Sequence, residues 1–410
     1  MEPSRAGAAQ SWSIVIAAGI VMGAALGVRH TQGLFMQPVL VDQGWTREAF
    51  GFAVAVQNLL WGLAQPFTGM LADRYGSARV IFVGMAVYAL GLVLMAQAST
   101  PTAFTLTNGL LIGLALSGTA FGTVYAALSR IFAAEARGWA LAVAGAVGGL
   151  GQFAMVPAVQ SLLSALEWTT VCLVLGATIA ALSPLAVLLR EPRRTAHDVG
   201  ETGAASVRAA VGEAFSDRGF WLLNTGFFAC GFQLAFIATH LPAYLSDQGL
   251  TAHHAALALA CIALANVFGM YYAGRSVGVL SSKNVLAGVY LVRAVAMLLF
   301  ISFPVTAGGT YAFAALMGFL WLGTAPLTNA LVVRLFGTRY VATLFGFVFF
   351  GHQLGRFLGV WLGGYVYDVF QSYELIWLVA IAAGLVAAVL HLAIDESPVA
   401  QRQTVSELQG

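Results

Sequence analysis

The sequence has 410 residues, of which 60% are hydrophobic and 9% are charged. A soluble domain carries roughly 25% charged residues, so the composition excludes an ordinary water-soluble protein and predicts a surface that faces lipid. The net charge of +2 gives no reason to expect a nucleic-acid partner. The three cysteines lie within apolar runs, and their spacing indicates neither a metal site nor a disulfide framework.

Twelve apolar runs are long enough to cross a hydrocarbon layer, which takes about 20 residues of helix. They predict helices over residues 13–36, 48–71, 78–98, 103–128, 139–163, 168–189, 219–244, 252–274, 284–304, 310–333, 341–366 and 373–394. We therefore expect an all-α membrane protein with twelve transmembrane helices.

One long polar stretch, residues 190–218, divides these runs six and six. It predicts a hydrophilic linker with room for a short surface helix. The expected domains are a six-helix bundle over 1–189, the linker, and a second six-helix bundle with a tail over 219–410.

The basic residues predict an orientation, because Lys and Arg gather in cytoplasmic loops. With the amino terminus inside, most of the 19 Lys and Arg residues fall on the inner side, and only Arg47 falls in an outer loop. We expect a multi-pass protein of the cell (inner) membrane, with both termini and the linker in the cytoplasm.

The two halves also repeat short motifs in the same order. Residues Val41–Thr46 match Ser246–Thr251, and Gly118–Ala120 match Gly323–Ala325, both about 205 residues apart. Residues Arg130–Phe132 match Arg334–Phe336, and Leu150–Phe153 match Leu354–Phe357, both about 204 apart. Two parallel repeats related by an axis along the membrane normal are a transporter architecture, with the substrate site between the halves near the midplane.

The loop after the second run, Gly69-Met70-Leu71-Ala72-Asp73-Arg74-Tyr75-Gly76-Ser77-Ala78-Arg79, resembles the signature loop of the major facilitator superfamily. This resemblance implies two pseudo-symmetric six-helix bundles that give alternating access to a central site. Asp73 can pair with an arginine or with the positive end of a neighbouring helix. Gly69, Asp73, Arg74, Gly76 and Arg79 would then form a conformational latch; a simple charged turn is the alternative.

Two further stretches resemble the monocarboxylate and oxalate/formate carriers within that superfamily. One is Gly27–Phe35 with Gly44–Arg47, and the other is Gly351–Arg356 with Gly363–Asp368. The resemblance implies transport of a small organic anion, with a monocarboxylate as the first expectation. It leaves open whether transport is proton symport or antiport (anion exchange).

Three arginines, Arg29, Arg293 and Arg356, lie within predicted spans, whereas the 17 acidic residues all lie in loops or near helix ends. A charge at the centre of a bilayer costs about 2.5–3.5 kcal/mol on insertion scales, so it indicates a function. An anionic substrate is the simplest counter-ion, because the planar guanidinium matches a carboxylate.

Depth favours two of these arginines as substrate-binding residues. Arg29 and Arg356 each lie about 15 residues into an outward-running span, which is roughly 23 Å from its cytoplasmic end. Each occurs in one half only, because Arg29 aligns with Leu234 and Arg356 with Gln152. The alternative is that helix-end carbonyls or water satisfy them. The resemblance to the superfamily implies that the span of Arg293 lies at the periphery, where hydrogen bonds between helices or snorkelling explain it as readily as binding.

Two histidines accompany the arginines. His352 lies four residues before Arg356 on the same helical face, and His30 is next to Arg29. Because histidine changes charge near physiological pH, both are proton-coupling candidates, with a neutral histidine bonded inside the bundle as the alternative.

Tyr125, Gln152 and Asn266 complete the predicted substrate site, although interhelical packing would explain each of them equally well. Gln57 and Asn58 are further polar candidates, and Trp61 and Trp321 could wall the cavity.

The sequence contains no phosphate loop, metal-ligand cluster or nucleophile–base arrangement, so we expect neither an enzyme nor a cofactor. The expected partners are a small anionic substrate, a proton if transport is symport, and the lipid bilayer, with the chain as a monomer. Two other functions stay open: an exporter of amphipathic drugs or metabolites, and a non-transporting receptor or scaffold.

Overall fold

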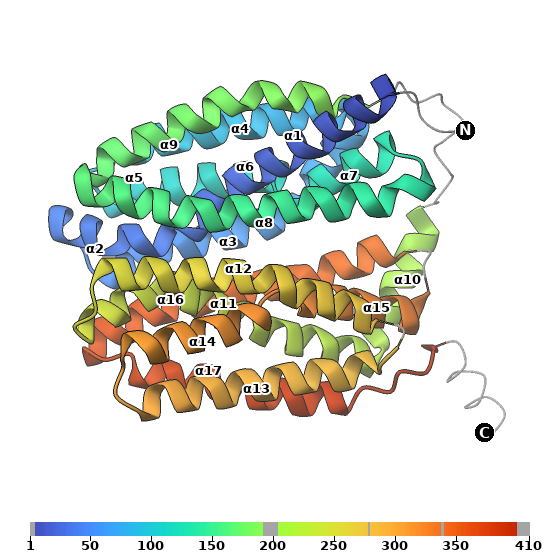
Figure 1. Ribbon diagram of the computed structural model, residues 1–410. Coiled ribbons are helices and arrows are strands. Elements are labelled where there is room, and N and C mark those ends of the chain that lie inside the picture. The colour runs from blue at the N-terminus through green and yellow to red at the C-terminus, as the bar shows by residue number, and fades with distance from the viewer. Residues whose placement is uncertain (1–4, 192–203, 278, 338–339, 400–410) are drawn as a thin grey trace.

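The computed structural model describes residues 5–191, 204–277, 279–337 and 340–399. In these ranges the chain consists of helices joined by loops, and one isolated β-bridge links Val277 and Leu280. Figure 1 shows long, nearly parallel helices in two layers, with α1–α9 in one layer and α11–α17 in the other. We call these the first and second layers.

The first layer starts with α1 and follows the chain through η2. Its helices are α1 (Arg5–His30), α2 (Gln32–Gln43), α3 (Arg47–Tyr75), α4 (Ser77–Met95), α5 (Pro101–Phe104), the π-helical η1 (Thr105–Leu111), α6 (Ile112–Thr119), α7 (Phe121–Ile131), α8 (Ala134–Ala165), α9 (Trp168–Leu182) and the 3-10 segment η2 (Ser183–Leu189). The short helix α10 (Ala204–Ser216) follows, within the stretch that the sequence predicts as a linker.

The second layer holds α11 (Arg218–Asp247), α12 (Ala252–Ser276), α13 (Ser282–Ser302), α14 (Ala307–Phe319), α15 (Thr324–Phe336), α16 (Val341–Phe370) and α17 (Glu374–Leu392). We call the end where α2 meets α3 and α11 meets α12 the distal end, and the end where α1 begins and α17 ends the proximal end (Figure 1).

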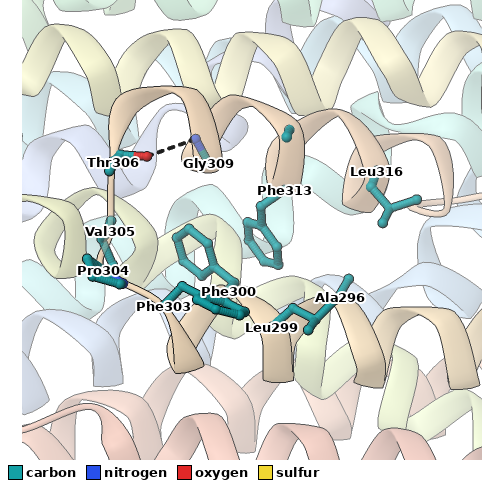
Figure 2. Close-up of a pocket in the computed structure, with 11 residues that line it drawn as sticks. Ala296, Leu299, Phe300, Phe303, Pro304, Val305, Thr306, Gly309, Phe313 and Leu316 are labelled. Atoms are coloured by element: carbon teal, nitrogen blue, oxygen red, sulfur yellow. Dashed lines mark hydrogen bonds between the residues drawn. The ribbon is translucent and has the colours of Figure 1, made fainter.

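The described helices have the composition and surface of a membrane protein. Ten of them, some joined across short breaks, are long and apolar enough to span a bilayer. The helices α3 and α16 are not among these ten, and their polar side chains, which include Gln57, Asn58, His352 and Arg356, lower their mean hydropathy. Large apolar side chains are exposed along α13 and α17, among them Leu299 in the pocket that Figure 2 shows, and only lipid would solvate them favourably.

The first predicted span is interrupted next to its charged residue, Arg29. Helix α1 ends at His30, and the amide of Thr31 donates to the carbonyls of Gly27 and Val28 before α2 begins. The hydroxyl of Thr31 donates to Val28 as well, at 2.8 Å. Arg29 therefore lies in the last turn of α1.

The fourth and tenth spans are broken at corresponding places of the repeat. Ala120 separates α6 from α7, and residues 320–323 separate α14 from α15. The carbonyl of Ser117 at the first break accepts from Gln65 and from the hydroxyls of Thr68 and Thr123. The repeated Gly-Thr-Ala motif thus marks a pair of interrupted helices.

Glycines let two helices of the second layer approach closely. A Cβ added at Gly231, Gly355 or Gly359 would collide with a backbone carbonyl of the partner helix, α16 or α11. Gly62 on α3 likewise leaves the space that the side chain of Gln353 occupies. The face of α16 that carries His352, Gln353 and Arg356 is held in place by these contacts.

Candidate functional site

The side chains of Arg29 and Arg356 meet at a single oxygen atom. Arg29 donates from Nη2 to Oδ1 of Asn58, and Arg356 donates from Nε to the same atom at 2.9 Å. The Nδ2 of Asn58 donates to the carbonyl of Val54 at 2.8 Å, which turns Oδ1 toward the arginines. Asn58 is fully buried, and Arg356 is 6% exposed.

The two guanidinium groups come from different layers, Arg29 from α1 and Arg356 from α16. Gln353 of α16 adds a further bond between the layers, from Nε2 to the backbone oxygen of Asn58 at 3.1 Å. The site therefore joins the layers about halfway along α3 and α16, whose midpoints lie near residues 61 and 355.

Charge is unbalanced at this site. At an effective dielectric constant of 20, two unit charges about 5 Å apart repel by roughly 3 kcal/mol. The acceptor they share is a neutral amide, and Nε of Arg29 is buried without a hydrogen-bond partner. Ion pairs in the described ranges, such as Arg47–Asp247, Arg130–Glu191 and Arg334–Glu396, lie near helix ends rather than here.

Aromatic rings line the same region. The guanidinium of Arg29 lies 5.2 Å from the ring of Trp61, which packs at 6.0 Å against Phe349. The ring of His352 lies 4.5 Å from Phe227 and 5.9 Å from Phe349. An anion with an apolar body could contact guanidinium groups with its charge and aromatic rings with its apolar part.

The two histidines differ in their surroundings. His352 is 3% exposed, and neither of its ring nitrogens has a hydrogen-bond partner. His30 is also buried, but its Nε2 lies 3.1 Å from the carbonyl of Leu259 on α12 of the other layer. Of these two histidines, His352 is therefore the one whose ring nitrogens are both unpaired. Leaving a buried polar group unpaired costs about 1–3 kcal/mol, which a hydrogen bond to a ligand would recover.

Three other sequence candidates are placed apart from this junction or have structural contacts. Asn266 accepts from the amide of Leu322 at 3.0 Å, so it stabilises the break between α14 and α15. Tyr125 lies against Gly145 of α8, where an added Cβ would be 2.6 Å from its hydroxyl. Gln152 is half-buried on α8. In the described ranges, none of the three is a hydrogen-bond partner of Arg29 or Arg356.

Arg293 makes hydrogen bonds between helices, which is one of the explanations that the sequence left open. It donates to the carbonyls of Leu320 and Trp321 at the break in span ten, the second at 2.6 Å, and to Sγ of Cys230 at 3.2 Å. Its guanidinium thus satisfies carbonyls that the end of α14 leaves unpaired, where the helix dipole is negative.

The predicted latch lies at the proximal end, between α3 and α4. Gly76 adopts a φ of 88° that separates the two helices, Arg74 stacks on Tyr75 at 5.3 Å, and Arg79 is exposed. Gly69 has open space around its Cα. The side chain of Asp73 lies outside the described residues.

A second polar cluster lies at the distal end, and few features of the sequence indicate it. Arg47 of α3 donates to both carboxylate oxygens of Asp247 at 2.7 and 2.6 Å, and to the hydroxyl of Tyr373 at 3.0 Å. The carboxylate of Asp368 accepts from the amides of Arg47 and Glu48 at 3.2 and 2.6 Å. We call Arg47, Glu48, Asp247, Asp368 and Tyr373 the distal cluster.

Asp368 of the distal cluster lies on α16 in the second layer and caps the start of α3 in the first layer. The first amides of α3 have no partner within their own helix. Thr46 accepts from Ala49 in the usual N-cap manner, but Asp368, on α16, accepts from Arg47 and Glu48. The sequence indicates only parts of this cluster: Arg47 is the single basic residue of the predicted outer loops, and Asp368 ends one of the carrier-like stretches.

Comparisons with known proteins agree with this architecture. The model of the Major Facilitator Superfamily matches residues 6–360. The MFS-type transporter YcxA of Bacillus subtilis is 24% identical over 379 residues, which cover 89% of this chain and 90% of that protein. Monocarboxylate transporter 13 of Bos taurus is 26% identical, covering 90% and 85%. The oxalate:formate antiporter of Oxalobacter formigenes is 25% identical, covering 86% and 84%.

Solved structures show the same fold. The nucleoside transporter NupG, in a variant form, superposes with a TM-score of 0.77 at 15% identity, covering 94% of this chain and 99% of that one. A bacterial homologue of the lysosomal transporter Spinster, inward-facing and occupied, gives 0.75 at 14% identity, covering 96% and 97%.

Proposed function

Because the chain belongs to the major facilitator superfamily and is a multi-pass membrane transporter, we propose that it carries a small organic anion, a monocarboxylate first of all. The observation that carries the proposal is the meeting of Arg29 and Arg356 on one neutral oxygen. A carboxylate has two oxygens and a full negative charge, so it matches the two guanidinium groups better than an amide does.

The arrangement also suits alternating access. One arginine belongs to each layer, so an anion between them is held by both bundles at once. We take residues 1–189 and 219–410 as the two moving bundles, joined by a linker over 190–218. The distal cluster would open as the loop over residues 69–79 closes, and that loop would act as the latch through Gly69, Asp73, Arg74, Gly76 and Arg79.

We further propose that the proximal end faces the cytoplasm and that the chain works as a monomer in the inner membrane. The positive residues of the proximal loops support this orientation. Transport is then secondary, either symport with a proton or exchange. His352 is the stronger coupling candidate, because neither ring nitrogen has a hydrogen-bond partner: one can accept a proton, and the one that carries hydrogen can donate to an anion. Tyr125, Gln152, Asn266 and His30 remain secondary candidates for substrate or proton contact.

Two substitutions test the arginine pair in proteoliposomes. We expect Arg29→Gln and Arg356→Gln each to reduce uptake of the transported carboxylate by about 10- to 150-fold, because each removes charge-assisted hydrogen bonds to the anion worth roughly 1.5–3 kcal/mol. Arg275→Gln is the matched control, since Arg275 is exposed at the proximal end of α12. Normal uptake by both arginine variants would refute the proposal.

A ligand screen by thermal stabilisation identifies the substrate class. Binding of a ligand to the folded state raises the unfolding temperature, so small carboxylates should stabilise the wild-type protein more than matched neutral compounds. Stabilisation by neutral or cationic amphipathic compounds alone would instead indicate an exporter that uses the rings of Trp61 and Phe349 for recognition.

A further inference from the structure

Asn58 is the residue on which both layers converge, and both polar atoms of its side chain are engaged. Oδ1 accepts from Arg29 and Arg356, and Nδ2 donates to Val54 within α3. Its backbone oxygen accepts from Gln353 as well. One fully buried residue therefore holds two charged groups and an amide from two helices, α1 and α16.

The neighbouring residue shows that a buried amide in α3 does not produce this arrangement by itself. Gln57 is equally buried, but it donates to Asn108 at 2.9 Å, and Asn108 donates to Gln32. That chain of amides stays inside the first layer. Of these two amides, Asn58 is the one that meets Arg356 of the second layer.

The link at Asn58 is electrostatically incomplete. Two full positive charges share one neutral oxygen, and the acidic residues whose ion pairs are described pair elsewhere, near helix ends. The donors already point at the place where a negatively charged oxygen would sit. An acceptor with a full charge would bind both guanidinium groups more strongly.

We propose that the Asn58 carboxamide oxygen is a stand-in for the substrate: in the empty carrier it occupies the position of a carboxylate oxygen, and the substrate displaces it. The inference rests on the proposed function, because it assumes that Arg29 and Arg356 bind the anion. It makes Asn58 a positioning residue that competes with the substrate and keeps the two guanidinium groups in register.

This role explains why a neutral side chain suits the position. An amide holds the arginines together but gives way to a carboxylate, and it lets the bundles part when the carrier is empty. A fixed carboxylate would satisfy both arginines permanently. Asparagine therefore sets how readily the site accepts an anion and how readily the empty carrier changes conformation.

The test compares two matched acids in the purified full-length protein. In Asn58→Asp the new carboxylate lies between both arginines, so we expect the ligand-free protein to melt several degrees above the wild type. Gln57→Glu places an acid one position along the same helix, among amides, and we expect it to melt lower. If Asn58→Asp melts no higher than the wild type while Gln57→Glu behaves as stated, the inference is wrong.

A third variant reads the competition directly, with sodium acetate as the probe and equal sodium chloride as the reference. Asn58→Leu removes the stand-in, so its ligand-free form should melt lower, yet acetate should raise its melting temperature more than that of the wild type. Acetate should not raise the melting temperature of Asn58→Asp. Equal acetate shifts in all three proteins would overturn the inference.

The outcomes separate this inference from the proposed function. Suppose that uptake of carboxylates depends on Arg29 and Arg356, but Asn58→Asp is not stabilised: the function stands and the stand-in role fails. Suppose instead that Asn58→Asp is stabilised, but no carboxylate stabilises the wild type or Asn58→Leu: the electrostatic link at Asn58 stands, while anion transport and displacement by a substrate both fail.

Discussion

Replacing Asp368 with asparagine should loosen the distal end of the molecule. The carboxylate accepts from two backbone amides in the first turn of α3, at 3.2 and 2.6 Å, and it belongs to the opposite layer. Asparagine offers only one acceptor oxygen, so one amide loses its partner and the negative charge at the helix N-terminus disappears.

The structure sets the size of this effect. One lost hydrogen bond to a charged group is worth roughly 1.5–3 kcal/mol, and the lost charge at the helix end adds roughly 0.3–1 kcal/mol. The Arg47–Asp247 pair remains. We therefore expect the closed distal end to lose about 2–4 kcal/mol, which shifts the ratio of open to closed states by about 30- to 900-fold.

Amide hydrogen exchange measures this shift without labels. Exchange in peptides that cover Arg47–Phe50 and the last turn of α16 should accelerate by a similar factor, since exchange follows the population of open states. Asp217→Asn is the matched control, because Asp217 accepts from the amide of Phe220 at the start of α11, in the second layer. If exchange at the start of α3 is the same in Asp368→Asn and the wild type, the cap between layers does not hold the distal end closed.

Three further predictions concern single residues. His352→Gln should abolish pH-driven uptake and spare exchange if His352 carries the proton; unchanged pH dependence in an uptake assay would exclude it. Arg293→Gln should lower stability by about 2–4 kcal/mol in a thermal melt, because it strips the carbonyls of Leu320 and Trp321 of their donor, yet it should leave the preference among anions unchanged in competition assays; altered preference would contradict a structural role. Gly355→Ala should cost about 1–3 kcal/mol by overpacking against Phe228, whereas Gly346→Ala, on the same helix with open space around it, should melt like the wild type; equal melting of the two variants would count against the close approach of α11 and α16.

Much of the fold could be predicted because it depends on short-range pattern. Lengths of apolar sequence indicate helices that cross the membrane, and the repeated motifs indicate two related halves. The similar depth of Arg29 and Arg356 follows from counting residues along straight helices, and the structure does bring the two side chains to one atom. Whether they bind substrate stays a prediction.

What the sequence could not supply was the direction in which side chains point around each helix axis. Asn58 was one polar residue among several, because nothing in a linear pattern says that α3 packs on α16. Substrate contact by Asn266 stays a prediction, and the sequence did not indicate that its oxygen accepts from Leu322, at a break in span ten that hydropathy does not reveal. The distal cluster escaped notice because Arg47 and Asp368 are more than 300 positions apart in the chain.

The two halves differ in the helix that carries Arg29, because α1 is interrupted after this residue. The corresponding helix of the second half, α11, runs without a break through Leu234, while Arg356 stands where the first half has Gln152. If the halves descend from one duplicated ancestor, each copy has since acquired a charge that its sister lacks. A pair of first halves would contain two copies of Arg29 and no counterpart of Arg356. A pair of second halves would contain two copies of Arg356 and no counterpart of Arg29. Neither half alone therefore supplies both arginines, and the meeting at Asn58 requires the two different halves in one chain.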